Sequence, residues 1–301
     1  ALVEREALRS LVPYDFEREP CEVELANNTN VYGPPPTAHQ IVREATGDLL
    51  SEYPTLYSAT VREAIAAYVG VDPSCVIVGA GSDDIIDCGF RALADPGSTV
   101  AYMHPTFMMA RYFATANSLR TVPVPLTTRF DCDADALLAV DAAVTYVCTP
   151  NNPTGTELST ASLERVLEGT RGVVMLDEAY AEFASVTHAA GAPAHGRLLV
   201  TGTLSKAFGL AGIRVGYGIG ARPLIAALEK VRGPYRLPTL SERAEVAALT
   251  NDVAWMRSVV ATISETREHF AAHLRELGLH PLPSAANFVF VPIANAHAVA
   301  E

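Results

Sequence analysis

The chain has 301 residues, of which 49% are hydrophobic and 19% charged, so it is too apolar for a disordered protein. Its length suits one large domain or two modest ones. The formal net charge of −12 repels phosphate backbones and anionic membranes, which argues against a nucleic-acid-binding or membrane-surface protein.

Strands alternate with helices through the middle of the chain. Before them, residues 1–58 are expected to hold a Pro-rich turn at 32–36 and a helix near 37–50. Six apolar runs rich in β-branched residues then predict strands, at 75–79, 99–103, 143–148, 172–177, 198–203 and 215–219. Amphipathic segments between them predict helices at 83–94, 106–117 and 160–168. The alternation predicts an α/β fold whose large, mostly parallel sheet is covered on both faces.

The part after residue 220 is mainly helical, with a long helix expected at 253–277 and an apolar strand at 287–291. These signals predict a smaller α+β domain built from both chain ends. We expect an N-terminal arm and part of this domain in residues 1–58, a large domain in 59–235, and the rest of the small domain in 236–301. No apolar run is long enough for a transmembrane helix, and the first ten residues are too charged for a signal peptide.

Two charged residues stand at the carboxyl ends of predicted core strands. Lys206 follows strand 198–203, where partial desolvation would lower its pKa and free the amine for Schiff-base chemistry. Asp177 ends strand 172–177, where α/β sheets bind ligands, and a protonated pyridine nitrogen would give it a cationic partner. Taken alone, each also fits a structural role, as a solvated surface lysine and a helix N-cap aspartate.

Three more segments follow other strands. GAGSDD (79–84) opens a helix and favours an anion, to which Arg214 and Ser205 could add a cation and a hydroxyl; a simple structural cap fits it equally well. NNPTG (151–155) either aims the Asn152 amide at the mouth of the sheet or is an ordinary turn. Phe107 could stack on a flat ring or fill the core. Together, the five features predict a site for a flat, phosphorylated, cationic aromatic aldehyde.

The positions of the cysteines and lysines further limit the kinds of chemistry that the chain can carry out. The five cysteines are scattered and form no C-x-x-C, so we expect a reduced, cytoplasmic chain in which they act as small hydrophobic residues. There is also no H-E-x-x-H, and we predict no metal site. The only lysines are Lys206 and Lys230, so lysine-dependent chemistry has few candidate positions.

Three segments resemble the signatures of pyridoxal-phosphate-dependent aminotransferases of fold type I, in the class I and II superfamily. They are TPNNPTG (149–155), LDEAY (176–180) and SKAFGLAGIRVGY (205–217), and the resemblance covers essentially the whole chain. Within the superfamily the chain is most similar to histidinol-phosphate aminotransferases, through NTNVYGP (28–34), YP (53–54) and GSDD (81–84). The resemblance implies that the large domain binds pyridoxal 5′-phosphate.

The resemblance also implies a role for each residue around the cofactor ring. Lys206 would form the internal aldimine and move the proton during catalysis. Asp177 would pair with the pyridine nitrogen and keep it protonated. Tyr180 and Asn152 would hydrogen-bond the ring's 3′ oxygen, while Phe107 would stack on the ring in place of the more usual tyrosine.

A second group of residues is implied around the phosphate and the substrate. The residues expected around the phosphate are Gly81, Ser82, Asp83, Thr203, Ser205 and Arg214. Tyr53 would reach the phosphate from the other subunit of a homodimer. Tyr14, Asn30 and Tyr235 would lie toward the substrate.

The implied activity is a ping-pong exchange of an amino group between a small amine, with histidinol phosphate as the first choice, and 2-oxoglutarate with glutamate. The same scaffold leaves open an aromatic or other amino-acid aminotransferase, a phosphothreonine decarboxylase or a natural-product enzyme. A non-catalytic binding module is disfavoured because Lys206, Asp177 and Arg214 are all present. A dehydrogenase is disfavoured because Asp84 replaces the last glycine of a dinucleotide fingerprint, and a serine hydrolase because no G-x-S-x-G occurs.

The chain departs from the family pattern at two places. It stops at Glu301, whereas family members continue with a strand–helix segment whose arginine grips the substrate carboxylate. We therefore expect the C-terminal small domain to be incomplete in this sequence. Val31 stands where the family has proline.

Overall fold

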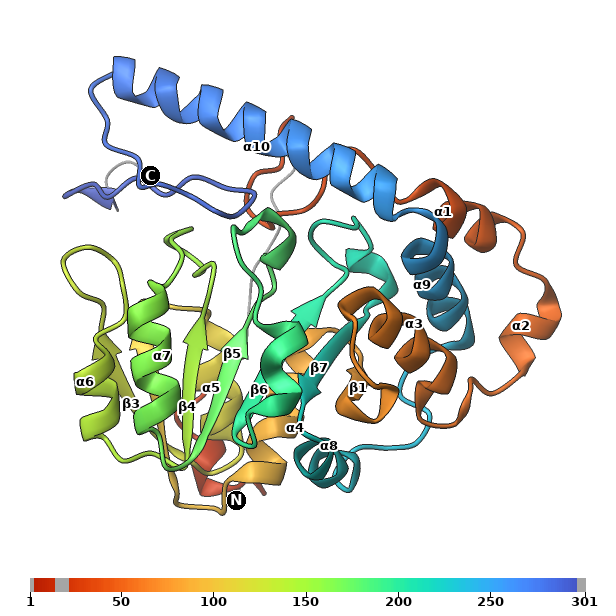
Figure 1. Ribbon diagram of the computed structural model, residues 1–301, viewed down its shortest axis with the longest axis horizontal. Helices are drawn as coiled ribbons and strands as arrows, with labels where there is room; N and C mark the ends of the chain where they lie inside the picture. The colour runs from red at the N-terminus through yellow and green to blue at the C-terminus, as the bar shows by residue number, and fades with distance from the viewer. Residues whose placement is uncertain (1–2, 14–21, 297–301) are drawn as a thin grey trace.

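A computed structural model of the protein describes residues 3–13 and 22–296, and a seven-stranded sheet lies at the centre of this part (Figure 1). The strand order is β1-β7-β6-β5-β4-β2-β3. The strands are β1 (Val76–Gly79), β2 (Thr99–His104), β3 (Arg120–Pro125), β4 (Val144–Cys148), β5 (Val173–Asp177), β6 (Leu198–Thr203) and β7 (Gly216–Gly220).

The strands run in one direction except for β7. Strands β3, β2, β4, β5 and β6 pair in parallel, and β7 is antiparallel to both β6 and β1. Because β1 is antiparallel to β7, it has the same direction as β6. The carboxyl ends of six strands and the amino end of β7 therefore meet at one edge of the sheet.

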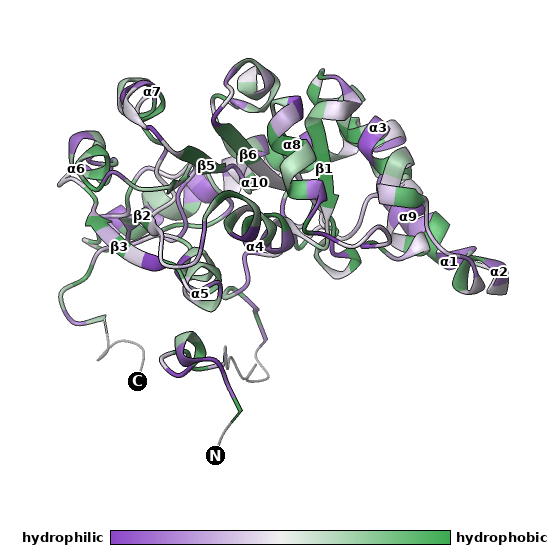
Figure 2. Cartoon of the chain, turned by 90° about the horizontal axis from the view of Figure 1, so that it is seen from below, coloured by the Kyte–Doolittle hydropathy of each residue, from purple (hydrophilic) through white to green (hydrophobic). Residues whose placement is uncertain are grey.

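Both faces of the sheet are covered, because alternate residues of buried strands point to opposite sides. One apolar cluster joins Ile77 and Met175 to helices α4 (Ser82–Leu93), α5 (Met108–Ala116) and α8 (Arg222–Glu229). The other cluster joins Val78 and Leu176 to the helices α3 (Ala59–Val69), α6 (Ala134–Ala139), α7 (Thr160–Gly169) and α9 (Thr239–Asn251). Figure 2 shows α4 and α5 on one side of the sheet and α7 on the other.

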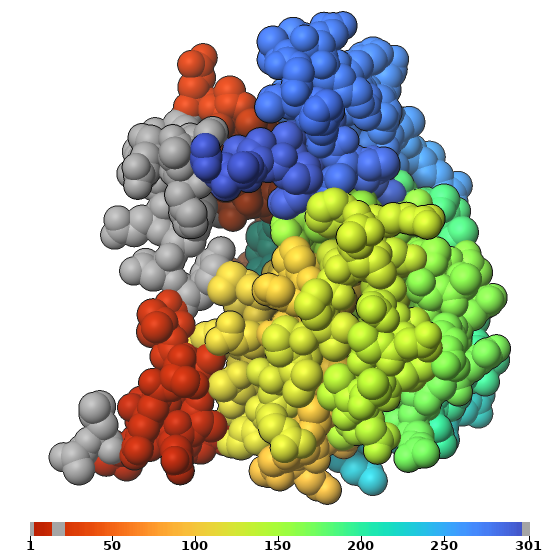
Figure 3. All heavy atoms as spheres, turned by 90° about the vertical axis from the view of Figure 1, so that its left-hand side faces the viewer, coloured from red at the N-terminus to blue at the C-terminus, as the bar shows by residue number. Residues whose placement is uncertain are grey.

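Helices from before and after the sheet lie side by side. Helices α1 (Pro36–Arg43) and α2 (Gly47–Ser51) pack against α9, which leads into the long α10 (Val253–Glu276) (Figure 1). The segment after α10 packs on the central part of the chain (Figure 3), where the Ala285 amide donates to the Gly155 carbonyl over 2.8 Å. The segment after α10 thereby approaches the edge of the sheet at which the strands end.

The predicted α/β fold with a mostly parallel, doubly covered sheet is confirmed, and each of the six expected strands is present within one or two residues. The strand β3 and the helices α3 and α6 were not predicted. The single helix expected near 37–50 is in fact α1 and α2, which are separated by residues 44–46, where Thr46 has an extended backbone. The proposed domain boundaries stay a prediction.

The strand predicted at 287–291 is wrong. The structure shows no strand there; the Leu282 amide donates to the Phe290 carbonyl over 2.9 Å, but no ladder forms with another strand. The apolar side chains pack on aromatic rings instead. The Phe288 ring meets Tyr180 edge-on with centroids 5.3 Å apart, and Phe290 meets Phe130 at 6.5 Å.

Four of the cysteines, Cys75, Cys88, Cys132 and Cys148, are buried and free, as expected for small hydrophobic residues, while Cys21 lies outside the described residues. Within residues 3–13 and 22–296, no helix is both long and apolar enough to cross a bilayer. A cytoplasmic location stays a prediction from the cysteine pattern.

Asp252, between α9 and α10, connects these helices to the start of α1. Its carboxylate is buried and accepts hydrogen bonds from the Thr37 amide (3.0 Å), the Thr37 hydroxyl (2.8 Å) and the Ala38 amide (3.2 Å) at the start of α1. We expect Asp252→Ala to lower the free energy of unfolding in urea by about 2–3 kcal/mol, because buried donors lose a charged acceptor. Asp135→Ala, which removes an exposed partner of Arg165, is the control and should change it by less than about 0.5 kcal/mol. Equal effects of the two variants would contradict this role of Asp252.

Candidate active site

The edge where the strands end carries four of the positions predicted for the site: Asp177, Lys206, the turn before α4 and Arg214. Asp177 is the last residue of β5, and Lys206 follows β6 by three residues. The turn before α4 follows β1, and Arg214 precedes β7, which runs the other way. The pairing of Gly216 with both Gly79 and Thr203 places the α4 turn beside the end of β6.

Asp177 is a buried carboxylate held by three donors. The Tyr146 hydroxyl donates to Oδ2 over 2.7 Å, while the Ala179 amide (3.1 Å) and the Thr201 hydroxyl (3.3 Å) donate to Oδ1. Burial raises the pKa of Asp177 to about 6, against the opposing effect of these hydrogen bonds. Among the described residues no lysine, arginine or histidine forms an ion pair with it, so its charge is left for a cation from outside the chain.

Lys206 is half-buried and lies among charged and aromatic groups. Its Nζ donates to the Asn27 carbonyl over 3.0 Å and lies 5.7 Å from the centre of the Tyr180 ring. Burial lowers the pKa of Lys206; the nearby Arg214 acts in the same direction, while Asp83 and Asp177 oppose it. A lysine with a lowered pKa is an available nucleophile and proton carrier.

The turn between β1 and α4 forms a cradle that only glycines allow. Gly81 has φ = +86°, and a Cβ on it would collide with the guanidinium of Arg214. Gly216 lies directly against the Ser82 amide, at the start of the helix. Arg214 Nη2 is 3.8 Å from Asp83 Oδ2, and the Arg214 side chain is half exposed. The free amides of the first turn and this guanidinium suit a phosphate group.

Thr203 and Ser205 complete this side of the site. The Thr203 hydroxyl lies 3.0 Å from the Val215 carbonyl, 2.9 Å from the Ser205 hydroxyl and accepts the Ser205 amide over 3.1 Å. These contacts fix the backbone between the end of β6 and Lys206.

The segment 27–30 contacts the residues around Lys206 and covers this part of the site. The Asn28 side-chain amide donates to the Tyr180 hydroxyl (3.1 Å). The Asn30 side-chain amide donates to the carbonyl of Ala207, which follows Lys206 (2.9 Å). The Asn287 amide in turn donates to the Asn28 carbonyl (2.9 Å). Parts of both chain ends therefore reach the lysine.

The remaining predicted residues have weaker support. Phe107 and Asn152 are half-buried and follow β2 and β4 at the same edge, but their roles toward a ring stay predictions. Tyr53 and Tyr235 stack with ring centroids 4.9 Å apart, and both are exposed. Tyr14 lies outside the described residues.

Sequence reasoning missed three contributors to the site: the Tyr146 hydroxyl on Asp177, the Asn27 carbonyl on Lys206, and Asn287. Nothing in the uniform apolarity of β4 marks Tyr146. Asn27 acts through its backbone, which no side-chain motif reveals.

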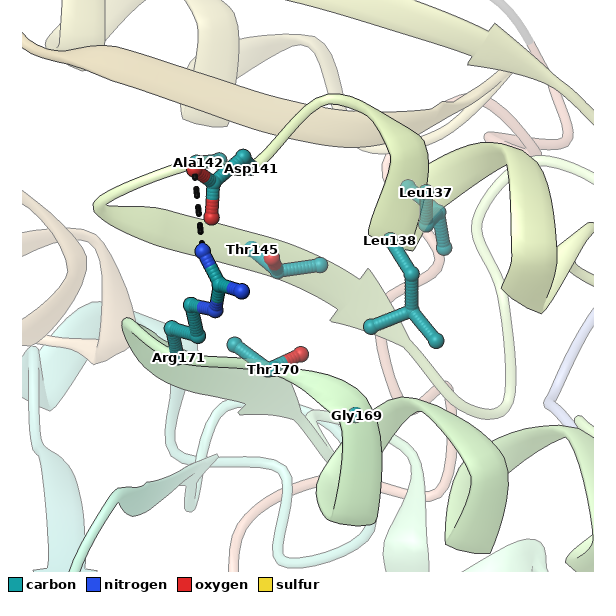
Figure 4. Close-up of a pocket in the computed structure, with 8 residues that line it drawn as sticks. All are labelled: Leu137, Leu138, Asp141, Ala142, Thr145, Gly169, Thr170 and Arg171. Atoms are coloured by element: carbon teal, nitrogen blue, oxygen red, sulfur yellow. Dashed lines mark ion pairs between the residues drawn. The ribbon is translucent and has the colours of Figure 1, made fainter.

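A cavity of about 280 Å³ lies elsewhere, near the amino ends of β4 and β5 (Figure 4). It is lined by Leu137, Leu138, Asp141, Ala142, Thr145, Gly169, Thr170 and Arg171. The Asp141–Arg171 ion pair spans 3.7 Å at its mouth. Because this cavity is at the opposite edge of the sheet from Lys206, it is separate from the candidate active site.

The arrangement fits a flat cationic ring that carries a phosphate. The buried carboxylate of Asp177 has no ion-pair partner among the described residues, so it favours a cationic ligand. A side chain at Gly81 would collide with the Arg214 guanidinium, so the glycine lets this guanidinium lie against the turn before α4. Lys206 supplies an amine within the same cluster of charges. The positions of Asp177, Lys206, Gly81 and Arg214 are compatible with pyridoxal 5′-phosphate, and their roles toward this cofactor stay predictions.

Comparison with known proteins identifies a family. The sequence profile of the family described as aminotransferase class I and II matches residues 22–301. Histidinol-phosphate aminotransferase 2 of Thiobacillus denitrificans is 37% identical over 287 residues, which are 94% of this chain and 80% of that protein. Histidinol-phosphate aminotransferase of Roseiflexus castenholzii is 38% identical over 275 residues, 89% of this chain and 74% of that protein.

Solved structures agree in fold. The crystal structure of histidinol-phosphate aminotransferase from Sinorhizobium meliloti in complex with pyridoxal 5′-phosphate superimposes with a TM-score of 0.85. It is 26% identical, and the match covers 91% of this chain and 76% of that one. A putative aminotransferase from Burkholderia pseudomallei has a TM-score of 0.80 at 28% identity, covering 90% of this chain and 82% of that one.

The raised pKa of Asp177 predicts how pH acts on the cofactor-free protein. Because the native pKa of about 6 exceeds the ordinary value of 3.8, the folded protein binds this proton more tightly than the unfolded chain does. The resulting stability is fully present below about pH 4 and is lost as pH rises through about 6. Asp177→Asn removes this dependence, so wild type should lose about 2–3 kcal/mol relative to the variant between pH 4 and pH 8.

The measurement is urea unfolding of both cofactor-free proteins across this range. Asp135→Asn, at an exposed position, serves as the control and should run parallel to wild type. If the Asp177→Asn curve also runs parallel to wild type, the carboxylate does not titrate in this way.

Proposed function

Because this chain belongs to the class I and II aminotransferase family, whose enzymes use pyridoxal 5′-phosphate, we propose that it transfers the amino group of histidinol phosphate to 2-oxoglutarate. The observation that carries the reaction type is the meeting of Lys206, Asp177 and the Gly81–Arg214 cradle at one sheet edge. The substrate is supported by the names of the relatives, several of which are histidinol-phosphate aminotransferases covered over most of their length.

When bound, pyridoxal 5′-phosphate supplies an aldehyde that condenses with amines and a protonated ring that accepts electrons. Asp177 would face the ring's cationic nitrogen, and this partner would stabilise the ionised carboxylate that burial now disfavours. Arg214 and the amides at the start of α4 would hold the phosphate. These contacts bind and orient the ring with respect to Lys206.

Lys206 is the proton carrier of the proposed reaction. Its Nζ lies among the charged groups of Asp83, Asp177 and Arg214, and burial lowers its pKa. The lowered pKa favours the neutral amine, which can take the proton from the substrate carbon that bears the amino group. The Asn27 carbonyl holds Nζ by a single hydrogen bond, which is easily exchanged when the amine moves. The Asn28–Tyr180 and Asn287–Asn28 hydrogen bonds hold a covering segment over the lysine, which restricts the access of water.

We expect Lys206→Ala to lower the rate of glutamate formation from histidinol phosphate and 2-oxoglutarate by at least about a hundredfold, because no other positioned amine moves the proton. The control is Lys230→Ala, which removes the chain's other lysine at an exposed position and should keep wild-type turnover. Turnover is followed by a coupled assay for glutamate, and the circular dichroism spectrum checks the fold.

Two outcomes of this assay would contradict parts of the proposal. Wild-type turnover in Lys206→Ala would remove the lysine from the mechanism. Wild-type protein that ignores histidinol phosphate but uses aromatic amino acids would keep the reaction type and reject the substrate.

We further propose a homodimer in which Tyr53 serves the partner's phosphate site. The support is that Tyr53 is 81% exposed although its ring stacks on Tyr235, and that Leu56 and Tyr57 beside it are exposed as well. Large exposed apolar groups of this kind are typical of protein interfaces. Mixing equal amounts of Tyr53→Ala and Lys206→Ala subunits should restore up to about a quarter of wild-type activity, because about half of the dimers are mixed and each mixed dimer holds one intact site of two. A monomer in sedimentation analysis, or mixtures as inactive as the parents, would contradict the shared site.

A further inference from the structure

The first turn of α4 carries two neighbouring carboxylates, Asp83 and Asp84, beside the turn proposed to bind a phosphate. The start of a helix attracts anions, but carboxylates in the same turn also repel a second anion there. Each carboxylate has its own arginine. Arg214 approaches Asp83 at 3.8 Å, and Arg236 approaches Asp84.

The contact between Arg236 and Asp84 is a fork. Arg236 Nε lies 3.0 Å from Asp84 Oδ1 and 2.9 Å from Oδ2, and Nη2 donates to Oδ1 as well. The Asp84 side chain is only 9% exposed. Such multiple charge-assisted bonds fix the carboxylate in orientation as well as in charge.

Asp84 in turn fixes the turn itself. Its Oδ2 accepts the Ala80 amide over 3.0 Å, in the middle of the turn. The same oxygen lies so close to Gly79 that a Cβ there would meet it at 2.6 Å. The position of this one carboxylate therefore sets the path of the backbone that leads into α4.

Asp84 also remains charged. Burial disfavours its ionised form, but the hydrogen bonds from Arg236 and Ala80 outweigh this and hold the pKa of Asp84 below its ordinary value. Without Arg236, a nearly buried negative charge would face the site of the phosphate.

Arg236 comes from a distant part of the chain, the connection between α8 and α9. This connection is fastened to the segment that carries Tyr53, because the Tyr57 amide donates to the Pro234 carbonyl and the Thr239 hydroxyl to the Glu52 carbonyl, each over 2.8 Å. Arg236 lies outside the motifs that predicted the site, and no role was expected for it.

We propose that Arg236 is a positioning residue for the phosphate-binding turn: it neutralises and orients Asp84, and so prepares the start of α4 for the phosphate of the cofactor. This inference rests on the proposed function, because the phosphate concerned is that of pyridoxal 5′-phosphate. Arg236 acts through Asp84.

The test compares the binding of pyridoxal 5′-phosphate with that of pyridoxal, which lacks the phosphate, to cofactor-free protein, followed by the absorbance of the ring bound at Lys206. Arg236→Gln should weaken the binding of pyridoxal 5′-phosphate by about tenfold and that of pyridoxal by less than about twofold. Arg236→Lys, which keeps the charge but loses the fork, should fall between the variant and wild type. The control is Arg222→Gln at the start of α8, which breaks an exposed 2.8 Å ion pair with Asp72; this variant should bind both compounds as wild type does.

A second variant separates the positioning role from direct contact with the phosphate. Asp84→Asn removes the charge that Arg236 neutralises and keeps an oxygen for the Ala80 amide. Added to Arg236→Gln, it should restore most of the lost affinity, whereas a residue that touches the phosphate directly would not be rescued.

The outcomes distinguish the two claims. Equal losses for pyridoxal 5′-phosphate and pyridoxal, unchanged binding in Arg236→Gln, or no rescue by Asp84→Asn would each overturn the role of Arg236 while the proposed function stands. Wild-type protein that binds neither compound would overturn the proposed function itself.

Discussion

The shared direction of six strands is the constraint on which the site depends. Asp177, Lys206 and the turn before α4 are at least 29 residues apart along the chain, yet each lies at or just after the carboxyl end of a strand in the same sheet. Strand β7 runs the other way, so Arg214, two residues before its first residue, lies at the same edge, where β7 begins. The connections can change without moving these four points, because the hydrogen-bonded sheet holds them.

Burial at this edge gives the polar groups their chemistry. Desolvation lowers the pKa of Lys206 and raises that of Asp177 to about 6, so both groups lie closer to neutrality than they would in water. The sheet tolerates Asp177 because Tyr146, Ala179 and Thr201 satisfy its oxygens. A cationic ligand can then form the ion pair that Asp177 lacks within the described residues. The same carboxylate therefore affects both the stability of the fold and the binding of the ligand.

The sequence predicted those parts of the fold that local pattern determines. Buried strands of such a sheet are nearly continuous apolar runs, and the six that were recognised are of this kind, although β7 is antiparallel to its neighbours. Strand β3 was missed because it lies at the edge of the sheet and contains Pro123 and Pro125, which such a position allows but a strand pattern does not suggest. The run at 287–291 has strand composition, yet Phe288 and Phe290 pack on aromatic rings and no partner strand pairs with it in the described part of the chain.

The site followed the same rule. Motif residues at strand ends were found because spacing and topology suffice to bring them together. Tyr146, the Asn27 carbonyl and Arg236 were not, because each acts across a long stretch of chain and only the packing of the folded protein makes the contact. The pairing of Arg236 with Asp84 shows that residues outside the signatures can shape the part of the site that the signatures define.

The most direct test of the account is a single turnover without a keto acid. The enzyme, loaded with pyridoxal 5′-phosphate, is mixed with excess histidinol phosphate, and the ketone released is counted per site. The account predicts one ketone per site and then a halt, with one glutamate formed when 2-oxoglutarate is added. Continued turnover without a keto acid, release of carbon dioxide, or no ketone from a protein that holds its cofactor would contradict an amino-group transfer from histidinol phosphate.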